Sequence, residues 1–149
     1  MVILRYLSVK ILDLYFIFIH FLFGTDDYKI SATKSLYETE KGHDVSIEWY
    51  FNFPESDALF IDIAIVDSVT NTALKLIAFT AANTSFVPYD SMKGRLSISK
   101  PIRDSLTQRG VRIVIPNVES RDGGYYRCMA VMRNGKIIES VARLVVLGN

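Results

Sequence analysis

The sequence has 149 residues and a single cysteine, Cys128. An internal disulfide bond is therefore excluded, although small exported domains usually carry cysteines in pairs. An excess of charge of one sign is also absent, because 17 basic residues stand against 16 acidic residues. A neutral chain without a cluster of lysine and arginine lacks the charge that binds a phosphate backbone, so nucleic acid is not expected as a partner.

The first 24 residues differ in composition from the rest. Two basic residues precede an apolar run at 14–23, and the small residue Gly24 follows it. This order predicts a secretory signal peptide over residues 1–24 and one domain over residues 25–149. A membrane anchor and a buried N-terminal strand are the alternatives. The run is short for a bilayer about 30 Å thick, however, and polar residues follow it at once.

A chain with such a leader is expected to be secreted or to lie on the external side of the plasma membrane. The triplet Asn83-Thr84-Ser85 fits this location, because it forms an acceptor for N-linked carbohydrate at Asn83. A second apolar run of about 18 residues is absent from the sequence. The product is therefore expected to be either secreted or the first part of a longer receptor.

The sequence after residue 24 has the pattern of an all-β protein. Helical periodicity is absent, and short alternating or apolar runs bounded by turn residues recur about every ten residues. Residues 81–90 are predicted to form a loop, and strands are predicted at 45–51, 59–66, 73–79, 94–99 and 111–115. In the second of these strands, the face that carries Phe60, Asp62 and Ala64 should meet solvent or a partner.

The dipeptide Asn134-Gly135 is the strongest local signal. It lies between two apolar runs and predicts a hairpin with a two-residue turn, which requires positive φ at both positions. Counting outward from this turn pairs Val131 with Ile138. The apolar residues at the end of the chain then disagree in phase with the start of their strand, so a bulge is expected near Ala142.

The segment from Asp122 to Cys128 reads D-G-G-Y-Y-R-C and matches the D-x-G-x-Y-x-C pattern of the immunoglobulin superfamily. The domain therefore resembles a variable-type (V-set) domain, which is an immunoglobulin-like Greek-key β-sandwich. The resemblance implies a tyrosine corner at Tyr126, an ion pair between Arg95 and Asp122, and a core position for Cys128. Apolar and glycine positions at suitable spacings support it: Gly42, Val45, Ile47, Ile113, Ile115 and Val118.

The sequence departs from this family at the centre of the domain. Trp49 occupies the position of the family's first cysteine, and Ile61 lies near the usual position of its core tryptophan. The sandwich is therefore expected to lack the usual inter-sheet disulfide bond. Our hypothesis is that Trp49 packs against Cys128 across the two sheets and fills the volume that the bridge normally takes.

The residues needed for catalysis are scarce, and the chain is not expected to be an enzyme. His43 and Cys128 are the one histidine and the one cysteine after residue 24. His43 lies about 20 Å along the strand from Trp49, at roughly 3.3 Å per residue, whereas Cys128 should face Trp49 itself. Metal-ligand spacings and glycine-rich phosphate loops are also missing, so we predict no metal, no cofactor and no small-molecule substrate.

Variable-type domains commonly dock through one face of the sandwich, and the resemblance implies such a face here. It would carry Phe60, Asp62, Ala64, Arg127, Met129, Val131 and Ile138. An apolar centre with charged edges is typical of a protein interface. Coverage of these side chains by the chain's own loops is the alternative. The expected partner is a protein receptor or ligand on another cell. A second copy of the chain, forming a homodimer across the same face, is the other partner considered.

The short turn at 134–135 disfavours an antigen receptor, because that class usually has a long loop at this place. The strand around Trp49 looks more like those of butyrophilin-type and costimulatory-ligand domains, or of related innate immune receptors. The resemblance therefore implies a ligand that modulates lymphocyte signalling through the T-cell receptor. An innate immune-type receptor ectodomain and a secreted decoy or adhesion module are the alternatives.

Overall fold

The structure is a computed structural model that describes residues 27–67, 70–79, 84–86, 92, 94–99 and 109–148. The expected signal peptide at 1–24 and the expected carbohydrate acceptor Asn83 lie outside the described residues. In the part of the chain that is described, no helix is long and apolar enough to cross a membrane.

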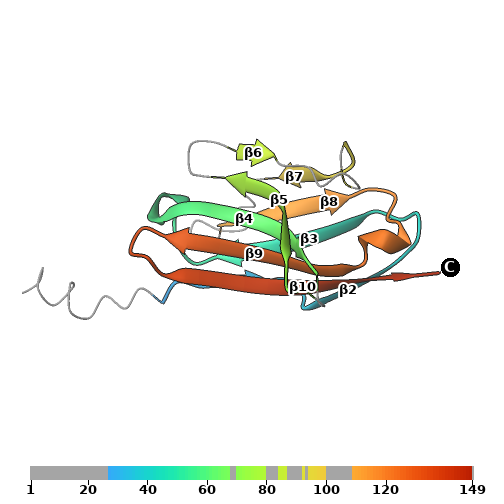
Figure 1. Cartoon of the computed structure of the whole chain (residues 1–149), viewed down its shortest axis with the longest axis horizontal. Coiled ribbons are helices and arrows are strands. Elements are labelled where there is room, and N and C mark those ends of the chain that lie inside the picture. Colours follow the sequence, from blue (N-terminus) through green and yellow to red (C-terminus); the bar gives the residue numbers. More distant parts are fainter. Residues whose placement is uncertain are drawn as a thin grey trace, which may run out of the picture.

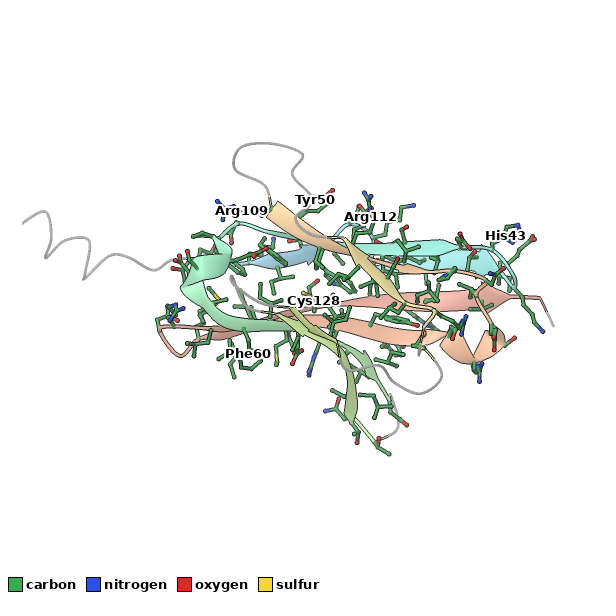
Figure 2. All side chains as sticks on the ribbon, turned by 90° about the horizontal axis from the view of Figure 1, so that it is seen from above. His43, Tyr50, Phe60, Arg109, Arg112 and Cys128 are labelled. Atoms are coloured by element: carbon green, nitrogen blue, oxygen red, sulfur yellow. The ribbon has the colours of Figure 1, made fainter. Side chains whose placement is uncertain are left out.

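Two β-sheets are stacked face to face (Figures 1 and 2). The four-stranded sheet has the order β1 (Ile30–Ala32), β3 (Val45–Phe51), β8 (Arg109–Ile115) and β7 (Ser97–Ser99). The six-stranded sheet has the order β2 (Leu36–Glu40), β10 (Ile137–Leu147), β9 (Gly124–Met132), β4 (Ala58–Val66), β5 (Ala73–Phe79) and β6 (Thr84–Phe86). Two short 3-10 turns, η1 (Glu55–Asp57) and η3 (Ser120–Asp122), complete the described elements.

The order of the strands is that of a Greek key. The chain passes from one sheet to the other between β3 and β4, and again between β8 and β9. It also changes sheet between β1 and β2, two short strands near its start. Most of the paired strands run antiparallel, whereas β2 pairs parallel with β10, with Arg143 opposite Leu36. The all-β sandwich predicted from the sequence is thereby confirmed.

Alternating side chains build the core between the sheets. Every second residue of β3 from Val45 to Phe51 is buried, and so is every second residue of β9 from Tyr126 to Met132. Figure 2 shows Cys128 in the space between the two layers. Since one face of each strand is buried in this way, the opposite face of each sheet is left to meet solvent or a partner.

The predicted strands at 45–51 and 73–79 have the predicted bounds, and β4 and β8 begin one and two residues earlier than predicted. Strand β7 is shorter than the predicted 94–99, because Gly94 lies in a turn with a φ of 75°. Strands β1 and β2 were not predicted, and β6 lies inside the segment 81–90 that was predicted to be a loop. These additional strands are short and lie at or beside the edges of the sheets.

The register predicted for the β9–β10 hairpin is wrong by one residue. Val131 pairs with Ile137. The backbone N–H of Met132 donates to the carbonyl of Lys136 over 2.8 Å, so three residues form the loop and not two. In this loop Gly135 has a φ of 84°, whereas the predicted turn would require positive φ at both of its central residues.

A shift of one residue exchanges the two faces of β10. Ile138 therefore packs against the core, and its assignment to a docking face is wrong. Ile137 takes the outward position and is 62% exposed. The pairing with β9 runs without interruption past Ala142, so the bulge expected there is absent. The apparent conflict of phase disappears because Val141 faces outward, with 44% of its surface exposed.

Candidate partner-binding face

Strand β4 contributes less exposed surface than the sequence predicts. Asp62 and Ala64 were expected to meet solvent or a partner, but they are 2% and 1% exposed. Both lie opposite residues of β9, Asp62 beside Met129 and Ala64 beside Arg127. Both residues lie in the middle of the sheet, between β9 and β5, and Arg127 lies 3.7 Å from Asp62. Phe60 is half-buried, and in Figure 2 it lies on the side of β4 away from the other sheet.

Strands β9 and β10 carry exposed side chains on the outward side of the six-stranded sheet. The outward residues of three strands form one surface, the outer face. Its residues are Phe60, Asp62, Ala64 and Val66 on β4, Tyr125, Arg127, Met129 and Val131 on β9, and Ile137, Glu139, Val141, Arg143 and Val145 on β10. Among its large apolar side chains, Ile137, Val141 and Tyr125 are 62%, 44% and 36% exposed. The guanidinium of Arg143 lies 5.7 Å from the centre of the Tyr125 ring.

Arg127 lies near the middle of the outer face between two carboxylates. Its nitrogen atoms are 3.7 Å from an oxygen of Asp62 and 3.8 Å from an oxygen of Glu139. These separations are ion-pair distances that are too long for hydrogen bonds. Arg127 is thus held in place by electrostatic attraction to the two carboxylates. Its Nε–H group is buried and has no acceptor among the described residues.

A shallow groove of about 420 Å³ opens beside Arg127. Its lining is half apolar and half polar and comes from β4, β9, β10 and the turn after β4: Val66, Asn71, Tyr125, Arg127, Glu139 and Val141. The apolar members can exclude water around a partner side chain, while Arg127 and Glu139 provide charges of both signs. Such a groove suits a side chain of a protein partner.

One end of the sandwich is closed by a network around Asp122, which is 1% exposed. Arg95 donates to both carboxylate oxygens of Asp122, at 2.7 and 3.3 Å, so the ion pair implied by the resemblance is present. The hydrogen bonds to Asp122 raise the pKa of Arg95 above its ordinary value. The Tyr126 hydroxyl donates to the Asp122 carbonyl over 2.6 Å, and burial raises the pKa of Tyr126.

Comparison with solved structures shows which fold this sandwich has. No family model and no curated protein sequence matches the chain. A structure of murine CRIg superposes with a TM-score of 0.62 and 13% sequence identity, over 81% of this chain and 98% of the CRIg chain. The chain folds as a variable-type immunoglobulin domain. A second similar chain belongs to a structure described as the structural basis of T cell specificity and activation by the bacterial superantigen toxic shock syndrome toxin-1. Its TM-score is 0.60 at 16% identity, over 80% of this chain and 99% of that chain.

The sandwich lacks the disulfide bridge that usually joins the two sheets of this fold, because Cys128 is a free, buried thiol. Trp49 stands on β3 in the four-stranded sheet, Cys128 on β9 in the six-stranded sheet, and both are 0% exposed within one apolar core. Burial raises the pKa of the Cys128 thiol well above its ordinary value. Direct packing of Trp49 on Cys128 stays a prediction.

The Cys–His pair considered from the sequence is not assembled in the domain. His43 lies in the turn between β2 and β3, with its side chain 67% exposed and its Nδ1 3.9 Å from Glu40. Figure 2 shows His43 at one end of the sandwich and Cys128 in its interior. These two side chains therefore cannot act together on a substrate.

Sequence reasoning missed five residues of the outer face that the structure exposes: Tyr125, Ile137, Glu139, Val141 and Arg143. The missing information is the length of the hairpin loop. A three-residue loop with glycine at its last position is the next most common hairpin after the two-residue turn. Counting from that loop would have placed all the outward residues of β10 correctly.

Proposed function

We propose that the chain is an extracellular binding module of the immune or cell-surface kind, which contacts a protein partner through the outer face. The distribution of exposed apolar surface carries this proposal. Among the described residues, the large apolar side chains that are more than a third exposed all lie on strands of the six-stranded sheet, four of them on β9 and β10, and none occurs on β3 or β8 of the other sheet. There the ion pair of Glu48 with Arg112 lies on the outer side.

The chemistry of the outer face supports protein contact over other ligands. Exposed apolar surface on a soluble domain usually marks an interaction site, and protein interfaces combine an apolar centre with a polar rim. Val141 and Tyr125 provide such a centre, with Glu139 and Arg143 beside them. The fold alone does not select the partner, so the proposal rests on this face.

Within this class we propose a ligand of the butyrophilin-like or costimulatory kind that modulates lymphocyte signalling. The three-residue loop between β9 and β10 supports this choice, because a domain that reads antigen usually carries a long loop there. Secretion, or display on the external side of the plasma membrane, would follow from a signal peptide at 1–24. The alternative is an innate immune-type receptor ectodomain, which would bind its partner through the same face. It would differ from the ligand in which of the two contacting cells carries the chain.

Staining of living cells tests the proposed function. The full chain is produced in a secreting host, joined into tetramers through a C-terminal tag, and applied to lymphocytes and antigen-presenting cells with detection by flow cytometry. The wild type is expected to stain a defined cell population, and Val141→Asp is expected to lower the staining at least about tenfold by placing a charge in the apolar centre.

The matched control is Val114→Asp, which places the same charge on the outer side of β8 in the opposite sheet and is expected to stain as the wild type does. Wild-type tetramers that stain no cell population would overturn the proposal. Equal staining by Val141→Asp and the wild type would also overturn it, because binding would then not need the outer face.

A further inference from the structure

The outward residues of β10 form a sequence that is complementary to its own reverse. From the start of the strand they are Ile137, Glu139, Val141, Arg143 and Val145. Their order is apolar, acidic, apolar, basic, apolar. When the strand is read backwards, each apolar residue meets an apolar residue and each charge meets the opposite charge. Val141 lies at the centre of this pattern.

We propose that the outer face binds a second copy of this chain, with the two β10 strands crossing antiparallel at Val141. A twofold axis in the plane of the interface and perpendicular to the strands places each residue opposite its mirror position. Glu139 of one copy then faces Arg143 of the other, twice in each dimer, while the two Val141 side chains meet at the axis. This inference deepens the proposed function and rests on its use of the outer face.

Strand β9 adds a second row of contacts to the same arrangement. Tyr125 lies beside Arg143, and Met129 lies beside Glu139. The twofold axis therefore brings Tyr125 of one copy over Met129 of the other, which is a favourable contact between an aromatic ring and a thioether. Arg127 lies beside Val141, near the axis. Asp62 and Glu139 of the same chain balance the charge of Arg127. Repulsion between the two copies of Arg127 therefore does not prevent dimerisation.

The size of the face is sufficient for a weak or transient dimer. Eight residues of strand span about 26 Å, and the three strands of the outer face together with the neighbouring β2 span roughly 19 Å. The face therefore offers on the order of 500 Å² from each copy, close to the total of about 1,000 Å² that separates biological interfaces from casual contacts. Sheets packed face to face in this way cross at about 30°, which keeps the centre of β10 in contact.

Charge reversal and its complementation test the dimer. Sedimentation equilibrium of the full chain is measured across the micromolar range for the wild type, Glu139→Arg and Arg143→Glu. The wild type is expected to dimerise. Each variant alone is expected to have a dimer dissociation constant at least about tenfold larger, because like charges meet twice in each homodimer.

An equimolar mixture of Glu139→Arg with Arg143→Glu is the decisive sample. In a mixed dimer, the two arginines of one copy face the two glutamates of the other, so dimerisation is expected to return to within about threefold of the wild type. Val114→Asp on the opposite sheet is the control and is expected to dimerise as the wild type does. Circular dichroism of each variant checks that it folds.

Failure of this inference can be distinguished from failure of the proposed function. A wild type that stays monomeric, or a mixture that stays as weak as the separate variants, overturns the second copy as the occupant of the face. If Val141→Asp nevertheless abolishes cell staining, the face still serves a different protein. If dimers form as described and cell staining does not depend on Val141, the dimer stands and the proposed function fails.

Discussion

The Tyr126 hydroxyl donates a 2.6 Å hydrogen bond to the carbonyl of Asp122, and the carboxylate of the same aspartate binds Arg95 at 2.7 Å. Asp122 also accepts a hydrogen bond from the backbone N–H of Glu119 over 2.8 Å. The turn η3, the start of β9 and the segment before β7 are thus tied together at one buried carboxylate. This network stabilises one end of a sandwich that has no disulfide bond between its sheets.

Removal of either charge of this pair should lower stability strongly. Arg95→Ala leaves Asp122 buried without its partner, and such a change costs about 3 to 5 kcal/mol at a buried pair, with the lower value expected here because Arg95 is 21% exposed. Chemical denaturation of Arg95→Ala, Asp122→Ala and the double variant measures the coupling.

The double variant is expected to lose clearly less than the sum of the two single losses. Arg121→Ala is the matched control, because Arg121 forms an exposed ion pair with Glu119 over 2.7 Å, and it should change the free energy of unfolding by less than about 1 kcal/mol. Additive losses in the double variant would show that Arg95 and Asp122 act independently.

Trp49 should contribute to stability through its volume and not through its N–H group. It is 0% exposed, and its Nε1 has no hydrogen-bond partner among the described residues. Trp49→Ala is therefore expected to cost about 3 to 5 kcal/mol, and Trp49→Phe clearly less, because phenylalanine keeps a ring and buries no unpaired donor.

Denaturant unfolding of these variants and of Cys128→Ser, followed by circular dichroism, gives the comparison. The hypothesis that Trp49 and Cys128 together fill the place of a disulfide bond fails if Trp49→Ala and Cys128→Ser each change the free energy of unfolding by less than about 1 kcal/mol.

Stability should fall in alkaline solution. Burial raises the pKa of Cys128 and of Tyr126 above their ordinary values of 9.0 and 10.0. The unfolded chain releases these protons first, so the contribution of each group is complete below its unfolded pKa and is lost as the pH rises toward its folded pKa. The loss is about 1.4 kcal/mol per pH unit for each group.

The free energy of unfolding measured between pH 7 and pH 11 should therefore decline above pH 9, and less steeply for Cys128→Ala than for the wild type. An identical decline in the wild type and in Cys128→Ala would mean that the thiol does not titrate differently in the folded and unfolded chains.

Gly110 should not tolerate a side chain. A Cβ atom at this position would lie 2.4 Å from the carbonyl oxygen of Trp49 on the neighbouring strand, and that backbone cannot yield without disturbing the pairing of β3 with β8. Gly110→Ala is expected to cost at least about 2 kcal/mol.

Gly123→Ala is the control for this substitution, because its Cβ would lie 3.3 Å from its nearest neighbour and its φ is −62°. Thermal unfolding of the two variants measures the difference. Equal melting temperatures would contradict the close approach of β8 to Trp49.

Patterns with a period of two residues could be predicted well from the sequence. The alternation of Val45, Ile47 and Trp49 locates β3, and the turn motif before Tyr126 locates β9. Strands β1 and β2 escaped prediction because each is short, and their pairing with β3 and β10 depends on residues far away in the sequence. Pairing between distant segments decides such strands, and local composition does not.

The candidate site was predicted less completely than the fold. The residues predicted for the face all lie on strands of the six-stranded sheet, but Ile138 was placed on the wrong side and Asp62 was expected to meet solvent or a partner. The first error follows from the length of one loop, since a single residue reverses every side chain of a strand. The second arises because a charged residue is usually exposed, whereas Asp62 is buried within the sheet and its charge is balanced by Arg127 at 3.7 Å.

The outward orientation of Val141 and the inward orientation of Ala142 underlie both proposals, and thiol labelling tests them most directly. Val141→Cys and Ala142→Cys are treated with a thiol reagent at concentrations where sedimentation shows monomers, with Cys128 left in place. Val141→Cys is expected to react one equivalent at the rate of a free thiol, while Ala142→Cys and Cys128 react only after unfolding. Rapid labelling of Ala142→Cys together with protection of Val141→Cys would contradict the register of β10 and the outer face built on it.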